Sequence, residues 1–109
     1  MEDIKINELV KVLVELGREK NFGYNKETIN VAEKFALIHS EVSEAYDAYR
    51  KKRFENTKDG FNQEVADIIL RTLHLCGCLE VDINQAIIDK MNFNKNRTWD
   101  FKNMNERKN

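Results

Sequence analysis

Two pairs of acidic residues are the groups in this chain whose types and spacing best suit chemistry. Glu41 and Glu44 form one pair and Glu64 and Asp67 the other, each with a spacing of three residues. On a helix, residues three apart lie one turn apart on the same face. The neighbouring residues are largely apolar, and an ionised carboxylate among apolar side chains is unfavourable unless a cation compensates it. The four acids therefore predict a site for a hard divalent ion, Mg2+ or its substitute Mn2+.

Each acidic pair also has a simpler explanation. The chain is 34% charged, and most acidic pairs on helices belong to solvated faces. Asp67 and Arg71 could form a structural ion pair, because residues four apart on a helix are neighbours. Both interpretations can hold together, since an arginine can also orient a carboxylate that binds a metal.

A second group of polar residues follows near the C-terminus. Lys90, Asn94 and Arg97 are separated by four and then three residues, which places them on one side of a helix and its exit. Two cations and an amide suit the oxygens of a polyphosphate. The alternative is a basic helix end that compensates the helix dipole. The chain has no glycine-rich phosphate loop, so a nucleotide would be held by metal and side chains.

Aromatic and histidine side chains offer weaker signals. Phe22, Tyr24 and Trp99 are candidate platforms for stacking a base, although core or interface aromatics would look the same. His39 and His74 are expected to be structural or to line a pocket. Neither forms a Glu-x-x-His pair, which argues against a ferritin-like di-iron centre.

The elements that must position these groups are helices. The sequence has no proline and only four glycines, and its apolar residues follow a 3.6-residue spacing. Helices are expected at about 4–20, 27–53, 62–80 and 82–94, the last with Asp82 and Gln85 as a capping box. The second helix, of roughly 26 residues, would be about 40 Å long and reach a partner subunit. Ile83, Ile87, Ile88 and Met91 are expected to face inward.

These expectations define an all-α, antiparallel four-helix bundle. Residues 1–99 should form one domain, and residues 100–109 a polar, frayed tail. A chain of 109 residues has a modest core, so oligomerisation is expected to complete it.

Charge and hydropathy limit the classes of partner. Lys plus Arg number 18 and Asp plus Glu 19, so no basic surface for nucleic acid is expected. The apolar runs are too short to span a membrane, and the N-terminus does not resemble a signal peptide. A cytoplasmic protein is the expectation.

The acidic and basic motifs together resemble those of the MazG-like nucleotide pyrophosphohydrolases, in the all-α NTP pyrophosphatase superfamily. That family carries EExxE, a variable gap and then ExxD. The matching segments are Ser40-Glu41-Val42-Ser43-Glu44 and Glu64-Val65-Ala66-Asp67, followed by Lys90, Asn94 and Arg97. The resemblance spans roughly residues 5–99.

The resemblance implies hydrolysis of a nucleoside triphosphate to monophosphate and pyrophosphate. Glu41, Glu44, Glu64 and Asp67 would hold Mg2+, and Glu44 or Glu41 would orient the attacking water. Lys90, Asn94 and Arg97 would bind the β- and γ-phosphates. The family also implies a homodimer or homotetramer whose neighbouring subunits complete the pocket.

One departure concerns the attacking water. The first glutamate of EExxE is Ser40 in this chain, which leaves open the identity of the general base. Two other functions stay open as well: a non-catalytic helical interaction module, and a related pyrophosphohydrolase with a substrate such as phosphoribosyl-ATP.

Overall fold

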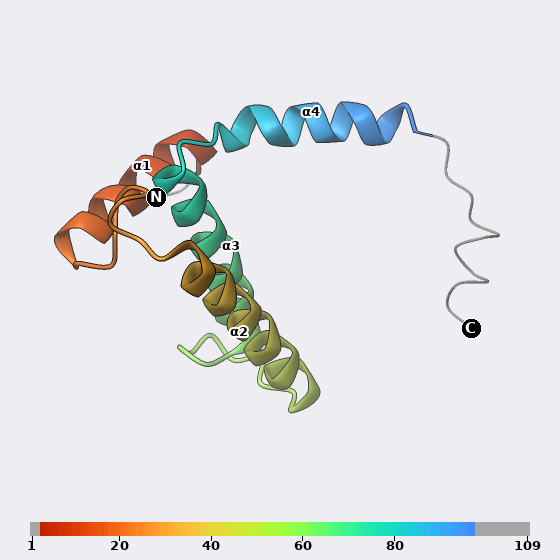
Figure 1. The fold of residues 1–109 in the computed structure, drawn as a ribbon. Helices are drawn as coiled ribbons and strands as arrows, with labels where there is room; N and C mark the ends of the chain where they lie inside the picture. The colour runs from red at the N-terminus through yellow and green to blue at the C-terminus, as the bar shows by residue number, and fades with distance from the viewer. Residues whose placement is uncertain (1–2, 98–109) are drawn as a thin grey trace.

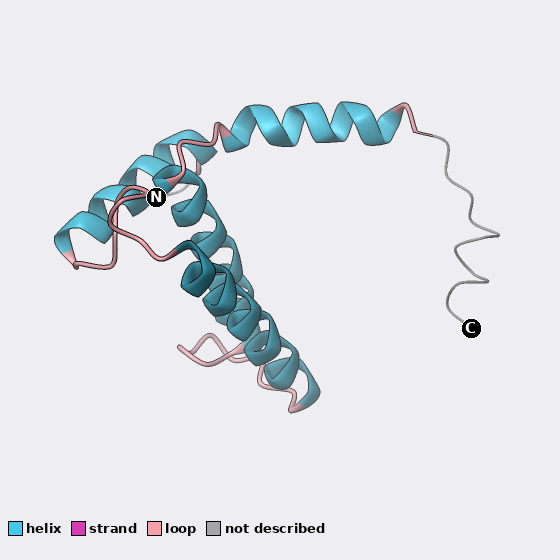
Figure 2. Ribbon diagram, viewed as in Figure 1, coloured by secondary structure: helices cyan, strands magenta, loops and turns pink. Residues whose placement is uncertain are grey.

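The computed structural model describes residues 3–97, and Figure 2 shows these residues as helices joined by loops, with no strand among them. The helices are α1 (Ile6–Glu19), α2 (Val31–Arg50), α3 (Phe61–Cys78) and α4 (Ile83–Lys95). The expected all-α fold with four helices is therefore confirmed. The expected frayed tail at 100–109 and the aromatic candidate Trp99 lie outside the described residues.

Helices α1, α2 and α3 end with the same backbone conformation. Asn21, Lys52 and Glu80 follow these helices with φ values of 63°, 57° and 58°. In each case the next residue donates its N–H to a carbonyl five positions earlier, as in Phe22 to Gly17 at 2.9 Å. This is the hydrogen bond of a Schellman motif, which satisfies a carbonyl at the helix end. The helices end here without proline and with non-glycine residues in the left-handed conformation.

The second helix is shorter than expected, with 20 residues rather than about 26. Its start moves to Val31 because Thr28 and Asn25 form a side-chain turn, in which Thr28 Oγ1 donates to Asn25 Oδ1 at 2.8 Å. Asn30 then caps the helix, accepting from the N–H of Glu33 at 3.0 Å. Its length is therefore about 30 Å, so the expectation of a 40 Å helix was wrong.

Two interfaces hold the first three helices together. Val10 and Leu13 of α1 pack on Leu73 of α3 in the main apolar core. The second interface joins α2 to α3, which lie side by side and run in opposite directions (Figure 1). Ala45 and Ala48 are buried on α2, Ala48 completely, and such small side chains allow two helices to approach closely. The acidic pairs lie on these two helices.

The fourth helix extends away from the other three (Figure 1). Asp82 caps its start by accepting from the N–H of Gln85 at 3.1 Å, while the Gln85 side chain donates to Asp89 and so does not complete the expected capping box. Ile83 packs against the α1–α3 core. Ile87, Ile88 and Met91 do not face inward as expected, because α4 contacts mainly α1 and these side chains are 38%, 45% and 67% exposed.

Candidate metal centre and adjoining pocket

Three of the four predicted metal ligands converge between α2 and α3. Glu41, Glu64 and Asp67 each offer one carboxylate oxygen, and these oxygens all lie within 4.8 Å of one another. Glu41 comes from the middle of α2, and the other two come from the first half of α3. Because the helices are antiparallel and closely packed, a spacing of three residues on α3 suffices to bring both of its acids to Glu41. We call these three residues the acidic cluster.

The two glutamates of the acidic cluster are buried in an unusual way. Glu41 is 7% exposed and Glu64 is 6% exposed. The Oε2 atoms of both are buried and have no hydrogen-bond partner among the described residues. Buried polar atoms are normally paired, so two unpartnered carboxylate oxygens in one cluster leave a place for a hydrogen-bond donor or a cation. Carboxylate oxygens are the donors that Mg2+ and Mn2+ prefer, and the residues present therefore fit such an ion.

The electrostatics of Glu64 reflect this crowding. Burial is the main reason that the pKa of Glu64 rises from 4.5 to about 7, and the carboxyl groups of Glu41 and Glu44 contribute to the rise. Burial disfavours the charged form of an acid, and neighbouring negative charges act in the same direction. A divalent cation would reverse both effects.

Glu44, the fourth predicted ligand, lies beside the acidic cluster and is more exposed than the glutamates within it. Its charge acts on Glu64, and both side chains line a polar pocket of about 400 Å³. Residues of the loop between α2 and α3 complete the lining of that pocket, and no motif in the sequence pointed to them. The lining residues are Glu44, Asp47, Arg53, Glu55, Thr57, Asp59 and Glu64.

A second pocket, of about 470 Å³, lies on the other side of the acidic cluster. Asp67 and Arg71 belong to its wall, so it adjoins the acidic cluster directly. Its volume lies within the range of roughly 300–1,000 Å³ that is usual for small-molecule pockets. We call it the apolar pocket. It is lined by Leu13, Leu16, Phe22, Glu33, Lys34, Leu37, Asp67, Leu70, Arg71 and His74.

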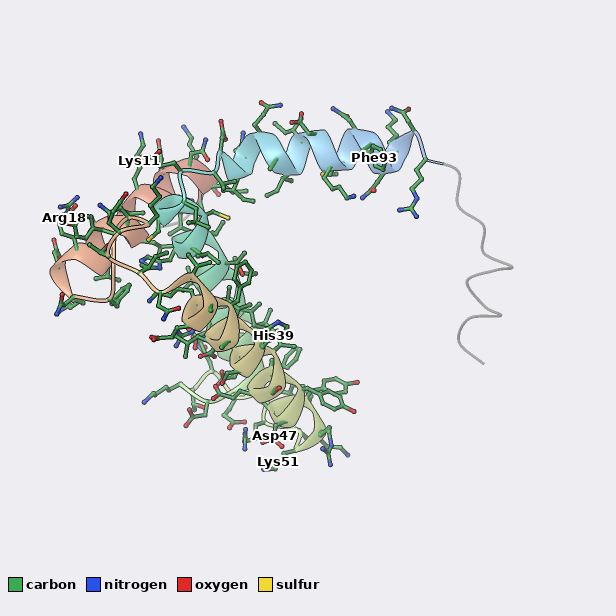
Figure 3. All side chains as sticks on the ribbon, viewed as in Figure 1. Lys11, Arg18, His39, Asp47, Lys51 and Phe93 are labelled. Atoms are coloured by element: carbon green, nitrogen blue, oxygen red, sulfur yellow. The ribbon has the colours of Figure 1, made fainter. Side chains whose placement is uncertain are left out.

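Phe22 and His74 set the shape of the apolar pocket. His74 is buried, and its Nε2 donates to the carbonyl oxygen of Gly23 at 2.8 Å. The Phe22 ring meets the His74 ring edge-on, with centroids 5.1 Å apart. Lys34 Nζ donates to the carbonyl of Phe22 at 2.8 Å. The structural, pocket-lining role expected for His74 is confirmed, whereas His39 points outward from α2 (Figure 3).

Arg71 has a different partner from the one that its sequence position suggested. Its Nε donates to Glu41 Oε1 at 3.0 Å, across the α2–α3 interface. The ion pairs of the described residues do not include Asp67 with Arg71. Helical spacing alone indicated Asp67, four residues away, as the partner of Arg71. The packing of α2 on α3 instead brings Glu41 to its Nε atom.

The predicted phosphate-binding residues Lys90, Asn94 and Arg97 do not meet the acidic cluster within one chain. Lys90 and Asn94 belong to α4 and Arg97 follows it, and this helix points away from α2 and α3 (Figure 1). Lys90 lies over the ring of Phe93 at 5.0 Å, and Phe93 itself is far along α4 (Figure 3). None of the three lines either pocket beside the acidic cluster.

Comparison of the chain with models of protein families, with curated proteins and with solved structures finds no match. The helices within residues 3–97 are all too short or too polar to cross a membrane.

Proposed function

We propose that this chain is a divalent-metal-dependent pyrophosphohydrolase that cleaves nucleoside triphosphates to monophosphate and pyrophosphate. The observation that carries the proposal is the acidic cluster, with its two buried and unpartnered carboxylate oxygens. Its position beside the apolar pocket supports a substrate with an apolar part next to an anionic part that the metal would bind. The resemblance of the motifs to MazG-like enzymes gives the reaction class.

The metal would be held by Glu41, Glu64 and Asp67, with Glu44 beside them. When bound, Mg2+ supplies a Lewis acid that neutralises the negative charge of the phosphates. Glu44 is the better candidate to orient the attacking water. Glu41 is buried and already paired with Arg71, whereas Glu44 is exposed and faces the polar pocket. A carboxylate in that position can accept a proton from water as it attacks the α-phosphorus.

The nucleoside part of the substrate would occupy the apolar pocket. Leucine side chains from α1, α2 and α3 and the ring of Phe22 form its apolar wall. Glu33 and Lys34 add polar groups on one side, which suits the hydrogen-bonding edge of a base. Asp67 and Arg71 mark the end of the pocket next to the acidic cluster, where the α-phosphate would lie.

A second copy of the chain would supply the residues for the β- and γ-phosphates. Lys90 and Asn94 belong to α4 and Arg97 follows it. Because α4 extends away from α2 and α3 (Figure 1), these residues fit this role only in an oligomer. The apolar side chains needed for association are present. Those of Val31, Phe35, Val42 and Tyr46 on α2 are 37%, 51%, 48% and 63% exposed and recur every three to four residues when partly buried Ile38 is included. We call this row the α2 stripe.

The direct test is product analysis after incubation with a panel of ribo- and deoxyribonucleoside triphosphates, with Mg2+ or with EDTA. We expect monophosphate and pyrophosphate to form with Mg2+ and not with EDTA. The Asp67→Asn variant should form neither product. Diphosphate and orthophosphate as products would contradict the proposed reaction, as would equal turnover by Asp67→Asn. The substrate source would be the cytoplasmic nucleotide pool.

The α2 stripe also favours a second candidate, a helical interaction module without catalysis. An exposed row of apolar side chains on a helix is typical of a docking face. Such a module would not need the acidic cluster, so its melting temperature would not respond to metal. A site that binds metal only in the folded state raises the melting temperature as the metal concentration increases.

A further inference from the structure

The contact between Arg71 and Glu41 places a cation on one oxygen of a predicted metal ligand. Arg71 Nε lies 3.0 Å from Glu41 Oε1, while Glu41 Oε2 is buried without a partner. The two oxygens of this carboxylate therefore have different surroundings. Oε1 accepts a hydrogen bond from Arg71, and Oε2 is available to an ion bound at the acidic cluster.

The two side chains of this pair differ in exposure. The Glu41 side chain is 10% exposed and that of Arg71 41%. Arg71 is anchored in α3, one turn after Asp67, and it hydrogen-bonds within residues 3–97 through Nε. A buried glutamate has several rotamers, and a charge-assisted hydrogen bond to one oxygen selects among them.

We propose that Arg71 is a positioning residue, which fixes the Glu41 carboxylate so that its second oxygen serves the metal. This inference rests on the proposed function, because it requires that the acidic cluster binds a divalent ion. Groups that orient metal-ligating side chains in this way strengthen metal binding although they never touch the metal.

Arg71 could also weaken metal binding, and the direction of the change on its removal distinguishes the two effects. A positive charge close to a cation site repels the metal. If repulsion dominated, removal of the arginine would tighten metal binding. If orientation dominates, as we propose, removal weakens it, because Glu41 is then free to turn away from Glu64 and Asp67.

The experiment measures Mn2+ binding to the full chain at pH 7.5, from the electron paramagnetic resonance signal of free Mn2+. We expect Arg71→Gln to weaken binding about 10–100-fold, the usual effect of losing such an orienting group. Arg71→Lys should bind with intermediate affinity, because lysine restores a donor but not the planar guanidinium. Its partial recovery also distinguishes a lost contact from a lost fold.

Arg18→Gln is the matched control. Arg18 pairs with Glu15 on α1 and lies over the ring of Tyr24 at 3.9 Å, and Figure 3 places it at a distance from α2 and α3. This variant should bind Mn2+ as the wild type does. Unchanged or tighter binding by Arg71→Gln would overturn the positioning role while leaving the proposed function intact. Absence of Mn2+ binding by the wild type would instead remove the proposed function itself.

Discussion

At the scale of single residues, the charge of Glu64 is expected to lower the stability of the metal-free fold, so that the site and the fold are in conflict. Its carboxyl group is buried beside Glu41 and Glu44, and its pKa is raised to about 7. A buried acid with an unpartnered oxygen lowers stability when it is ionised. A residue of this kind is expected where a ligand, rather than the fold, requires the charge.

Replacement of Glu64 by glutamine tests this conflict. Glutamine keeps nearly the same shape without the charge, so we expect Glu64→Gln to raise the melting temperature of the metal-free protein at pH 8. The same variant should lose the rise in melting temperature that Mg2+ gives the wild type. Both quantities follow from thermal unfolding monitored by circular dichroism. Glu27→Gln, an exposed change in the loop between α1 and α2, should alter neither. A Glu64→Gln variant that is destabilised and still responds to Mg2+ would contradict this interpretation.

The raised pKa of Glu64 also predicts how stability depends on pH. The folded state keeps the proton on Glu64 up to about pH 7, whereas the unfolded chain releases it near 4.5. Between these values the folded state binds more protons, so the contribution of Glu64 to stability decreases as the pH rises and becomes constant above pH 7. Urea unfolding of the metal-free wild type and of Glu64→Gln at several pH values isolates this contribution. An identical pH dependence in both proteins would show that Glu64 does not titrate in this way.

The sequence predicted shared helix faces for these acids, and the structure brings Glu41, Glu64 and Asp67 together. It also suggested Asp67 as the partner of Arg71, which pairs with Glu41 instead. The three-residue spacings of Glu41/Glu44 and Glu64/Asp67 are local, and helix geometry converts them directly into shared faces. The partner of Arg71 depends on how α2 and α3 pack, which local spacing does not specify. Lys34 of the apolar pocket could have been found, because it lies on the helix face of Leu37 and Glu41.

At the scale of elements, α2 has one buried face and one exposed apolar face. One face packs on α3 through Glu41, Ala45 and Ala48, and these residues are buried. A neighbouring face, about a quarter turn around the helix axis, carries the α2 stripe, which is exposed. The helix bounds expected from the sequence lie within a few residues of those observed. Its apolar pattern does not assign the apolar residues of α2 to an intrachain or an interchain contact. Periodicity identifies an apolar face and leaves its partner open.

The close α2–α3 contact gives a prediction for Ala48. This residue is 0% exposed, and a larger side chain would push the helices and the acidic cluster apart. We expect Ala48→Leu to lower the free energy of unfolding by roughly 1–3 kcal/mol, the usual effect of overpacking. Ala36→Leu makes the same change at an exposed position of the same helix and should have little effect. Urea denaturation compares them, and equal stabilities would contradict the close packing.

At the scale of the whole molecule, the exposed apolar side chains of α2 and α4 suggest that a single chain is incomplete. α4 extends beyond the body formed by the other helices (Figure 1), and Met91 and Phe93 on it are 67% and 62% exposed. Sequence periodicity predicted an inward face for α4, and the single chain offers nothing for most of that face to pack against. A second copy would provide this surface and bring Lys90 and Asn94 toward an acidic cluster.

A charge within the α2 stripe should prevent this association. We expect Phe35→Glu to shift the protein to the monomer and to abolish the proposed nucleotide hydrolysis, because the residues proposed to bind the phosphates would then be lost from the site. Ala36→Glu introduces the same charge at the adjacent exposed position off the stripe, and should leave the oligomer intact. Light scattering coupled to size-exclusion chromatography gives the mass. A monomeric wild type, or an unchanged Phe35→Glu oligomer, would rule out the α2 stripe as the interface.

We propose that Glu41, Glu64 and Asp67 form a divalent metal site, and calorimetric titration of Mn2+ into the metal-free protein measures this binding itself. We predict saturable binding at pH 7.5, at least about tenfold weaker in Asp67→Asn, since a ligand change costs no less than loss of an orienting group. Asp89→Asn, on α4, should bind as the wild type does. Absence of saturable binding, or equal affinity in Asp67→Asn, would contradict the claim.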